Sequence, residues 1–447
     1  MNRRALAAGL MLAATAATAP ARADAINVVE IFNNFFEPQK ITIAKGETVT
    51  WVSREGGHTV TANDDRFSFP ELGTSVRGDT FSWTFHEDET FSYRCLVHGP
   101  GMAGVVVVGA GSPPPPPPPE PPRRVVPSAD YPTIARALID AEPTTIIEVL
   151  PGIYHYGVVV ATSDVTIRGM GTSSEEVVID GDRQRAVGIA VGADGVRVEN
   201  LTVRNHGIAG LSFDGVARFG AHRIVAADNG SFGIRARGSH RGAIHASTAS
   251  GASSAGLAIQ DCDPCDIDVD ELTAAANAVG ALLENAGSII VRRSLIRGNG
   301  AGIVLTGSPL EQRGAHLWGN TIADNADPVA PRSSRSVGAG IWIDGGSHNL
   351  LEHNDVSGHR YGIVVTGVSG PSVADRIIGN TIGDSLLGDL AWDGLGADVC
   401  LAGNARPDGT EPSADPPIAG TIYSCDLPHT VGVPWPAVIA NMLNPSI

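Results

Sequence analysis

Short apolar segments that begin with a glycine recur through most of the chain. They lie at residues 188–191, 210–213, 233–236, 256–259, 280–283, 302–305, 340–343 and 362–365. The step between these glycines is about 22 to 24 residues, apart from one longer step, and a second apolar strand lies between most of them. This period, without a helical pattern, predicts a β-solenoid in which each coil stacks about 4.8 Å from the next.

The corners of these predicted coils are marked by glycine and asparagine, which both tolerate positive φ. Asparagines that close the second strand are Asn200, Asn205, Asn229, Asn277, Asn299, Asn320, Asn325 and Asn380. We expect stacked asparagine amides at such corners to hydrogen-bond along the axis. The longer glycine step predicts an insertion at about residues 308–337, as a loop that leaves the solenoid.

The pattern before residue 110 is different and predicts a separate small β domain. Residues 41–51, 90–95 and 104–108 have the composition of strands. A run of prolines at 113–119 then predicts a polyproline linker. Residues 131–138 are typical of a capping helix, and 145–154 and 165–169 of first coils. We therefore predict a domain at 26–109, a linker at 110–127, a solenoid at 128–430 and a tail at 431–447.

Four side chains in the first domain form a candidate metal site. Cys95, His98 and Met102 lie in one loop around a Gly-Pro-Gly turn, and His58 lies upstream. Two imidazoles, a thiolate and a weak thioether are the ligands of blue-copper electron-transfer centres. Taken singly, Cys95 is equally consistent with a disulfide, His98 with a surface residue and Met102 with core packing. Their order on a β-rich background favours metal binding.

Residues 26–109 resemble a cupredoxin of the plastocyanin or amicyanin type, through residues 36–38, 41–51, the His58 segment and the 95–102 loop. The resemblance implies a Greek-key β-sandwich that holds one type 1 copper ion. It implies that His58, Cys95 and His98 are strong ligands and Met102 the axial one. His86 matches no ligand position, and we interpret it as a surface residue.

Residues 128–430 resemble the right-handed parallel β-helix of the pectin-lyase-like superfamily. The glycine-led repeat and the 131–138 segment carry this resemblance. The scaffold hosts lyases, hydrolases, epimerases and binding proteins, so it indicates the fold and leaves the activity open. Together the two resemblances predict an all-β chain.

Composition and charge indicate an exported protein. The formal net charge of −17 argues against nucleic acid or anionic lipid as a partner. Arg3 and Arg4, an apolar run at 5–17 and small residues near Ala25 read as a signal peptide over residues 1–25. No later segment is apolar enough to predict an integral membrane span. We expect a periplasmic or secreted protein.

The cysteines agree with export. Five are present, and copper would take Cys95. The other four form two pairs that predict disulfides, Cys262 with Cys265 and Cys400 with Cys425. The Cys262–Cys265 motif contains a proline and lies between solenoid strands, which favours a structural disulfide. A redox dithiol or a second metal site is the alternative.

Catalytic residues in the solenoid are harder to identify, and we assign none. Acidic residues follow the glycine-led strands at Asp194, Asp214, Asp261, Glu284 and Asp344, and they form either an active-site column or a set of turn residues. The solenoid histidines are scattered, and we expect most of them on the surface.

The leading hypothesis is a copper protein for electron transfer or copper handling, whose β-helix docks a partner or binds a ligand. Its partners would be a redox or copper-delivery protein, with a carbohydrate as a further candidate ligand. The alternative is a polysaccharide lyase, hydrolase or epimerase that acts through the β-helix face. A weaker third idea is an adhesin that uses the solenoid as a stalk.

Overall fold

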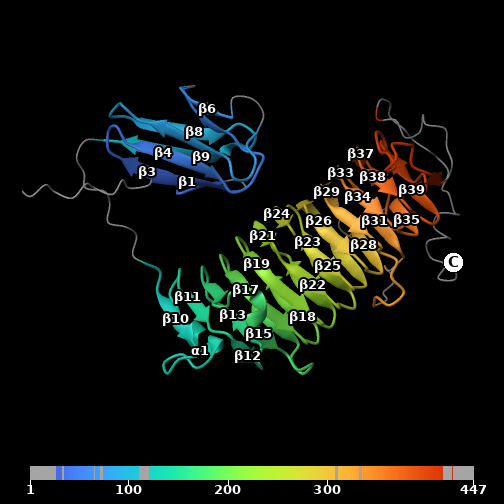
Figure 1. Ribbon diagram of the computed structural model, residues 1–447, viewed down its shortest axis with the longest axis horizontal. Coiled ribbons are helices and arrows are strands. Elements are labelled where there is room, and N and C mark those ends of the chain that lie inside the picture. The colour runs from blue at the N-terminus through green and yellow to red at the C-terminus, as the bar shows by residue number, and fades with distance from the viewer. Residues whose placement is uncertain are drawn as a thin grey trace, which may run out of the picture. The chain divides into compact units, whose positions relative to one another are not determined.

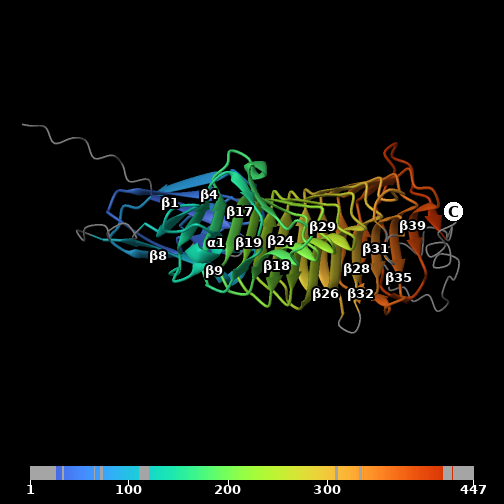
Figure 2. The same ribbon diagram turned by 90° about the horizontal axis from the view of Figure 1, so that it is seen from below.

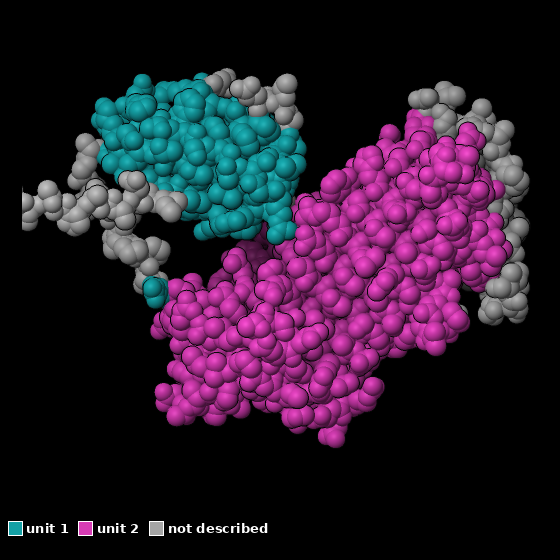
Figure 3. Space-filling model, in the orientation of Figure 1, with its two compact units in different colours: residues 1–120 teal, residues 121–447 magenta. Residues whose placement is uncertain are grey.

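The structure is a computed structural model that describes residues 27–32, 35–64, 66–70, 74–109, 120–307, 311–331, 335, 337–415 and 425. The expected signal peptide and C-terminal tail lie outside the described residues. The chain divides into two compact units, residues 1–120 and 121–447 (Figure 3).

The first unit is a sandwich of two β-sheets (Figure 1). Its strands are β1 (Asn27–Phe32), β2 (Phe35–Glu37), β3 (Lys40–Ile43), β4 (Thr48–Ser53), β5 (Val60–Ala62), β6 (Ser68–Phe69), β7 (Thr80–Thr84), β8 (Thr90–Cys95) and β9 (Gly99–Val108). One sheet has the order β2-β1-β4-β7 and the other β3-β9-β8-β5-β6. The predicted β domain is confirmed.

Alternating residues build the core between these two sheets. In β4, Val49 and Trp51 are fully buried while Thr48 faces solvent, which is the period of two expected of a half-buried strand. Gly46, at a φ of +86°, turns the chain between β3 and β4, so the apolar run at 41–51 forms two strands instead of one. Gly104 leaves room for the ring of Tyr93 beside β9, since a Cβ atom at this position would lie 2.3 Å from that ring.

The second unit is a parallel β-solenoid, seen along its length in Figures 1 and 2. A short helix, α1 (Ile134–Leu138), lies between the first two solenoid strands, and the hydroxyl of Thr133 caps it by accepting the N–H of Arg136. Val149, Ile167 and Val198 are fully buried on successive coils of the core. The predicted solenoid with inward Val, Ile and Leu is confirmed.

The solenoid strands fall into two groups that pair coil to coil. The sheet that contains the glycine-led strands, here named the glycine-led sheet, comprises β13 (Val158–Val160), β16 (Val187–Val191), β18 (Ala209–Asp214), β20 (Phe232–Arg237), β23 (Ala255–Cys262), part of β26 (Val279–Arg292), β28 (Ala301–Thr306), β31 (Ala339–Asp344), β35 (Tyr361–Thr366), β39 (Gly388–Trp392) and β41 (Ala414–Asp415).

The remaining solenoid strands, with the second part of β26, form the other faces. They are β10 (Arg123–Val126), β11 (Ile146–Val149), β12 (Gly152–Tyr154), β14 (Thr166–Gly169), β15 (Val177–Asp180), β17 (Arg197–Arg204), β19 (Gly220–Ala227), β21 (Gly242–His245), β22 (Thr248–Ser250), β24 (Ile267–Asp270), β25 (Thr273–Ala275), β27 (Leu295–Arg297), β29 (Arg313–Trp318), β30 (Thr321–Ala323), β32 (Gly346–Ser347), β33 (Leu350–Glu352), β34 (Asp355–Ser357), β36 (Ser372–Val373), β37 (Arg376–Ile378), β38 (Thr381–Gly383) and β40 (Gly396–Ala397). A single 3₁₀ turn, η1 (Ser174–Glu176), lies among the described residues.

Two ladders of buried polar side chains run along the corners. In the first, the N–H of Asn277 donates to Asn299 Oδ1 (2.9 Å), that of Asn299 to Asn325 Oδ1 (3.1 Å) and that of Asn325 to His359 Nδ1 (3.1 Å). The second ladder is formed by Ser294, Asn320, Asn354, Asn380 and Asn404. The expected amide stacking is therefore present.

Three expectations about boundaries differ from the structure. β9 begins at Gly99, not Gly104, because the hairpin pairs Cys95 with Gly99 directly. β10 lies within the segment expected as linker and pairs with β11. The predicted insertion is wrong for residues 313–323, which form the in-register strands β29 and β30.

Candidate metal centre

His58 is buried without a protein partner. It follows Gly57, which has a φ of +90°, in the connection between β4 and β5. Its side chain is 0% exposed, and neither ring nitrogen makes a hydrogen bond with a described residue. Burying a polar ring in this way costs free energy unless another group binds it, so the position is typical of a ligand.

Cys95 and His98 come to His58 from the hairpin between β8 and β9. Cys95 is the last residue of β8 and is buried, whereas His98 lies in the turn and is exposed. The Sγ atom of Cys95 lies 3.4 Å from Nδ1 of His98, and the rings of His58 and His98 are 4.9 Å apart between centroids. One ligand atom from each of the three residues lies within 4.8 Å of the others.

Thr59 holds the two loops together. Its backbone N–H donates to Cys95 Sγ at 3.4 Å, and its Oγ1 accepts the N–H of Leu96 at 2.8 Å. No motif in the sequence indicates this role, and the only signal for it is the position of Thr59 directly after His58. The threonine fixes the sulfur relative to the imidazole without contributing a metal ligand itself.

The surroundings of Cys95 favour a thiolate. Burial acts to raise the pKa of this thiol, but the imidazoles of His58 and His98 and the N–H of Thr59 outweigh it and lower the pKa to about 4. Cys95 forms no disulfide. A thiolate at neutral pH is the form that binds a soft metal ion.

Met102 lies close by in β9, and His86 does not belong to this group. The Met102 side chain is 1% exposed and belongs to the same buried cluster as Cys95. His86 follows β7 and is exposed, as expected of a surface residue. The donors present, two imidazoles and a thiolate with a thioether in the same core, fit a copper ion. The roles of His58, Cys95, His98 and Met102 as ligands stay a prediction.

The acidic column of the solenoid is occupied by structural contacts. Asp214 pairs with Arg235 (2.8 Å), and Glu284 pairs with Arg335 and accepts a hydrogen bond from Gln260. The other members also have partners: Asp194 accepts the N–H of Ala217, Asp261 binds Arg237 and Asn285, and Asp344 binds Thr366 and Ser369. These contacts support the interpretation of the column as corner residues.

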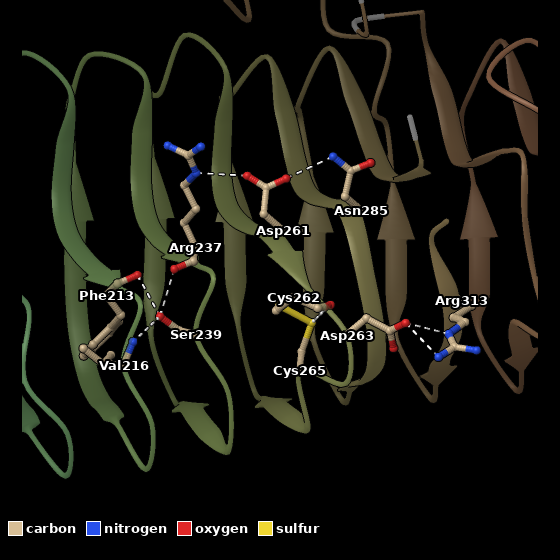
Figure 4. The surroundings of a disulfide bond; sticks show 10 residues. All are labelled: Phe213, Val216, Arg237, Ser239, Asp261, Cys262, Asp263, Cys265, Asn285 and Arg313. Atoms are coloured by element: carbon tan, nitrogen blue, oxygen red, sulfur yellow. Dashed lines mark hydrogen bonds and ion pairs between the residues drawn. A yellow bond between two sulfur atoms is a disulfide. The ribbon is translucent and has the colours of Figure 1, made fainter. Parts of the chain in front are cut away.

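Cys262 and Cys265 are joined by a disulfide, as the cysteine pairing predicts (Figure 4). The flanking Asp261 and Asp263 bind Arg237 and Arg313 on other coils. The bond lies at a corner of the solenoid (Figure 4). It is shielded from solvent, since Cys262 is 7% exposed and Cys265 is fully buried. Cys400 and Cys425 are also joined.

Two solenoid histidines are buried, although we expected most to lie on the surface. His206 and His359 are 1% and 3% exposed and occupy ladder positions. His359 accepts a hydrogen bond at Nδ1 from the backbone N–H of Asn325. Its Nε2 donates to the carbonyl of Ile322 at 3.0 Å, so the ring makes the same two bonds as an asparagine amide would. A lone histidine in the sequence carries no sign of such a role.

Two family models match the chain. The model for copper binding proteins of the plastocyanin/azurin family matches residues 27–109, and the model for the right handed beta helix region matches 151–322 and 265–382. A plastocyanin from Scenedesmus fuscus is 32% identical over 83 residues, which cover 16% of this chain and 85% of that protein. The chain belongs to both families. It joins a cupredoxin domain to a right-handed β-helix.

Solved structures resemble each part of the chain. The A-module of a mannuronan C-5 epimerase from Azotobacter vinelandii is 18% identical and covers 59% of this chain and 81% of its own, with a TM-score of 0.40. A reduced amicyanin variant is 30% identical and covers 20% of this chain and 86% of its own, with a TM-score of 0.17. Among the described residues, no helix has the length and apolar character needed to cross a bilayer.

Proposed function

We propose that this is an exported blue-copper protein that holds one type 1 copper ion and transfers single electrons, with the β-helix as a surface for docking or ligand binding. The observation that carries the proposal is the buried, unpartnered imidazole of His58 beside the thiolate-favouring Cys95. When bound, copper would cycle between two oxidation states. A fixed ligand set limits rearrangement as the electron moves.

The position of His98 supports exchange with a protein partner. His98 is exposed, and its neighbours Leu96 and Val97 are each 54% exposed. An exposed apolar rim around one ligand lets a partner approach the site while His58 and Cys95 remain shielded from water. Copper delivery to another protein is the related use of the same opening.

Copper loading of the full chain tests the proposal. We expect an intense visible thiolate-to-copper band at one copper per chain, and Cys95→Ser should remove it. His86→Ala is the matched control, since it alters an exposed histidine outside the cluster and should leave the band unchanged. A colourless protein that takes up no copper would overturn the proposal.

A second candidate function is action on a polysaccharide through the outer side of the coils. The observation that favours it is a group of ionisable side chains on β21, β24 and β26. His245 Nε2 lies 2.8 Å from Asp268 Oδ2, and Arg292 reaches the same oxygen at 3.0 Å. A histidine oriented by a carboxylate is a usual acid–base pair. Incubating the full chain and its His245→Gln variant with uronate polymers tests this candidate, and chain cleavage or epimerisation by the parent alone would support it.

A further inference from the structure

Aromatic rings begin next to the candidate copper site and continue through the core of the cupredoxin domain. Tyr93 lies two residues before Cys95 on β8, and both side chains are fully buried, because alternate residues of a strand share one face. The Tyr93 ring stands edge-on to that of Trp51, with centroids 5.3 Å apart. The phenol of Tyr93 and, beyond it, the indole of Trp51 therefore lie in the same buried cluster as the thiolate.

The series of rings reaches the surface at Trp83. Trp51 lies 5.7 Å from Phe67, and Phe67 lies 5.3 Å from Trp83, between ring centroids. A parallel branch runs through Phe81, which is 5.4 Å from Trp51 and 6.4 Å from Trp83. Trp51 is fully buried, whereas Trp83, on β7, is 36% exposed.

Core packing accounts for the buried rings, but it does not account for the exposed indole of Trp83 at the end of the series. Aromatic side chains fill a core efficiently, and edge-on contacts add a modest stabilisation. Indole and phenol are also the rings of proteins that lose an electron most readily. Neither Trp51 Nε1 nor Tyr93 Oη makes a hydrogen bond with a described residue. Neither ring therefore has a hydrogen-bonded base among the described residues to take a proton. An oxidised indole at Trp51 can be refilled by an electron alone, whereas the phenol of Tyr93 is hard to oxidise unless its proton leaves, so Tyr93 can act only as a bridge.

We propose that Trp83, Trp51 and Tyr93 form an electron relay that protects the domain against strong one-electron oxidants of the radical class. The oxidant takes one electron from the indole of Trp83 and is reduced. Trp51 refills Trp83, and the electron that refills Trp51 crosses the ring of Tyr93 as a bridge, without oxidising the phenol. When reduced copper is bound, the metal site would be the source of this electron and would end one electron more oxidised. No proton moves and no bond forms or breaks. This inference rests on the proposed copper function.

The test uses a ruthenium polypyridyl photo-oxidant attached to the full, copper-loaded and reduced chain at Ser82→Cys, an exposed position beside Trp83. After a flash, we expect a transient oxidised-indole absorption, followed by the thiolate-to-copper band. In Trp51→Phe, which keeps an aromatic ring in the core, the rate at which the band appears should fall at least about tenfold. In Trp83→Phe the indole transient should also be lost.

The matched control is Phe36→Leu. Phe36 contacts Tyr93 at 4.8 Å between centroids but lies off the route to Trp83, so the rate should be unchanged. The thiolate-to-copper band of the oxidised form, recorded before reduction, reports that each variant folds and binds copper. A coloured protein whose rate is the same with and without Trp51 and Trp83 overturns the relay alone. A colourless protein overturns the relay together with the copper proposal.

Discussion

At the scale of single residues, the cupredoxin site combines one shielded and one open imidazole around a thiolate. Neither ring nitrogen of His58 has a hydrogen-bond partner among the described residues and the ring is buried, whereas His98 faces solvent, so only one of the two rings is open from outside. Cys95 between them is held by Thr59. If both imidazoles bind copper as proposed, burial gives them different tasks: His58 would hold the ion in the interior and His98 would connect it to the surface.

Replacing Met102 by leucine should tune the site without abolishing it. The thioether is expected to be a weak axial ligand in a fully buried position, so Met102→Leu should keep the visible band and raise the reduction potential. Redox titration of the copper-loaded protein measures the potential. A lost band would instead assign Met102 to the primary ligand set.

Asp375 should make the solenoid more stable in acid than at neutral pH. Burial raises its pKa to about 7, in spite of hydrogen bonds from Asn349. Because the folded state holds this proton more tightly than the unfolded state, stability falls as pH rises from about 4 to about 7, by roughly 4 kcal/mol at most. Asp375→Asn should remove this fall. Urea unfolding near pH 5 and pH 8 measures it, and an unchanged pH dependence would contradict the assignment.

At the scale of elements, the corner ladders tie each coil to the next. Asn299 accepts from Asn277 and donates to the carbonyl of Ala274 and to Asn325, all within the protein interior. Asn299→Ala leaves these groups without partners and should lower the free energy of unfolding by about 3 kcal/mol. Urea denaturation followed by circular dichroism checks this, and a change within error would show that the ladder contributes little.

His359 should be replaceable by the residue it imitates. His359→Asn should alter stability at neutral pH by less than about 1 kcal/mol, because both side chains accept one hydrogen bond and donate another. Burial lowers the pKa of His359 to about 4, so the wild type loses stability as pH falls from about 6.5 toward 4. The His359→Asn variant should lose less stability than the wild type over that pH range. The exposed His353→Asn is the control and should change neither value.

The sequence predicted elements best where a repeated pattern encodes them. The glycine-led segments such as 302–305 lie where the period places them, and α1 lies within the predicted helix at residues 131–138. β29 was missed because Arg-Gly-Ala-His-Leu-Trp lacks the Val and Ile content of the other coils. The loop residues Cys95, His98 and Met102 were recognisable from their order, whereas the contact of Thr59 with Cys95 depends on two distant loops meeting.

At the scale of the whole molecule, two compact units of different construction share one chain. The cupredoxin has a small sandwich core, and the solenoid core is extended and built coil by coil. The family matches support copper binding for the first, while the activity of the second is still a proposal. Each unit should therefore respond to its own ligand.

Copper should make the unfolding transitions of the two units distinguishable in calorimetry. A ligand that binds only the folded cupredoxin stabilises that unit by mass action and leaves the solenoid unaffected. We expect two unfolding transitions. Copper should raise the midpoint temperature of the cupredoxin transition, and Cys95→Ser should cancel that rise. Reduction of the disulfides should lower the midpoint temperature of the solenoid transition, since the Cys400–Cys425 bond contributes roughly 3 kcal/mol of stability by loop closure. One transition that shifts as a whole would contradict this independence.

The corner ladders also restrict how the solenoid can change length. Each amide must find its counterpart one coil away, so an insertion or deletion between a strand and its corner would break the ladder at that coil. The loops absorb extra residues instead, since successive partners in the first ladder are 22, 26 and 34 residues apart. Removal of a complete coil would instead join two matching corners and preserve the bonding. A family of such chains should accordingly vary in size by whole turns, with irregular additions confined to the loops between them.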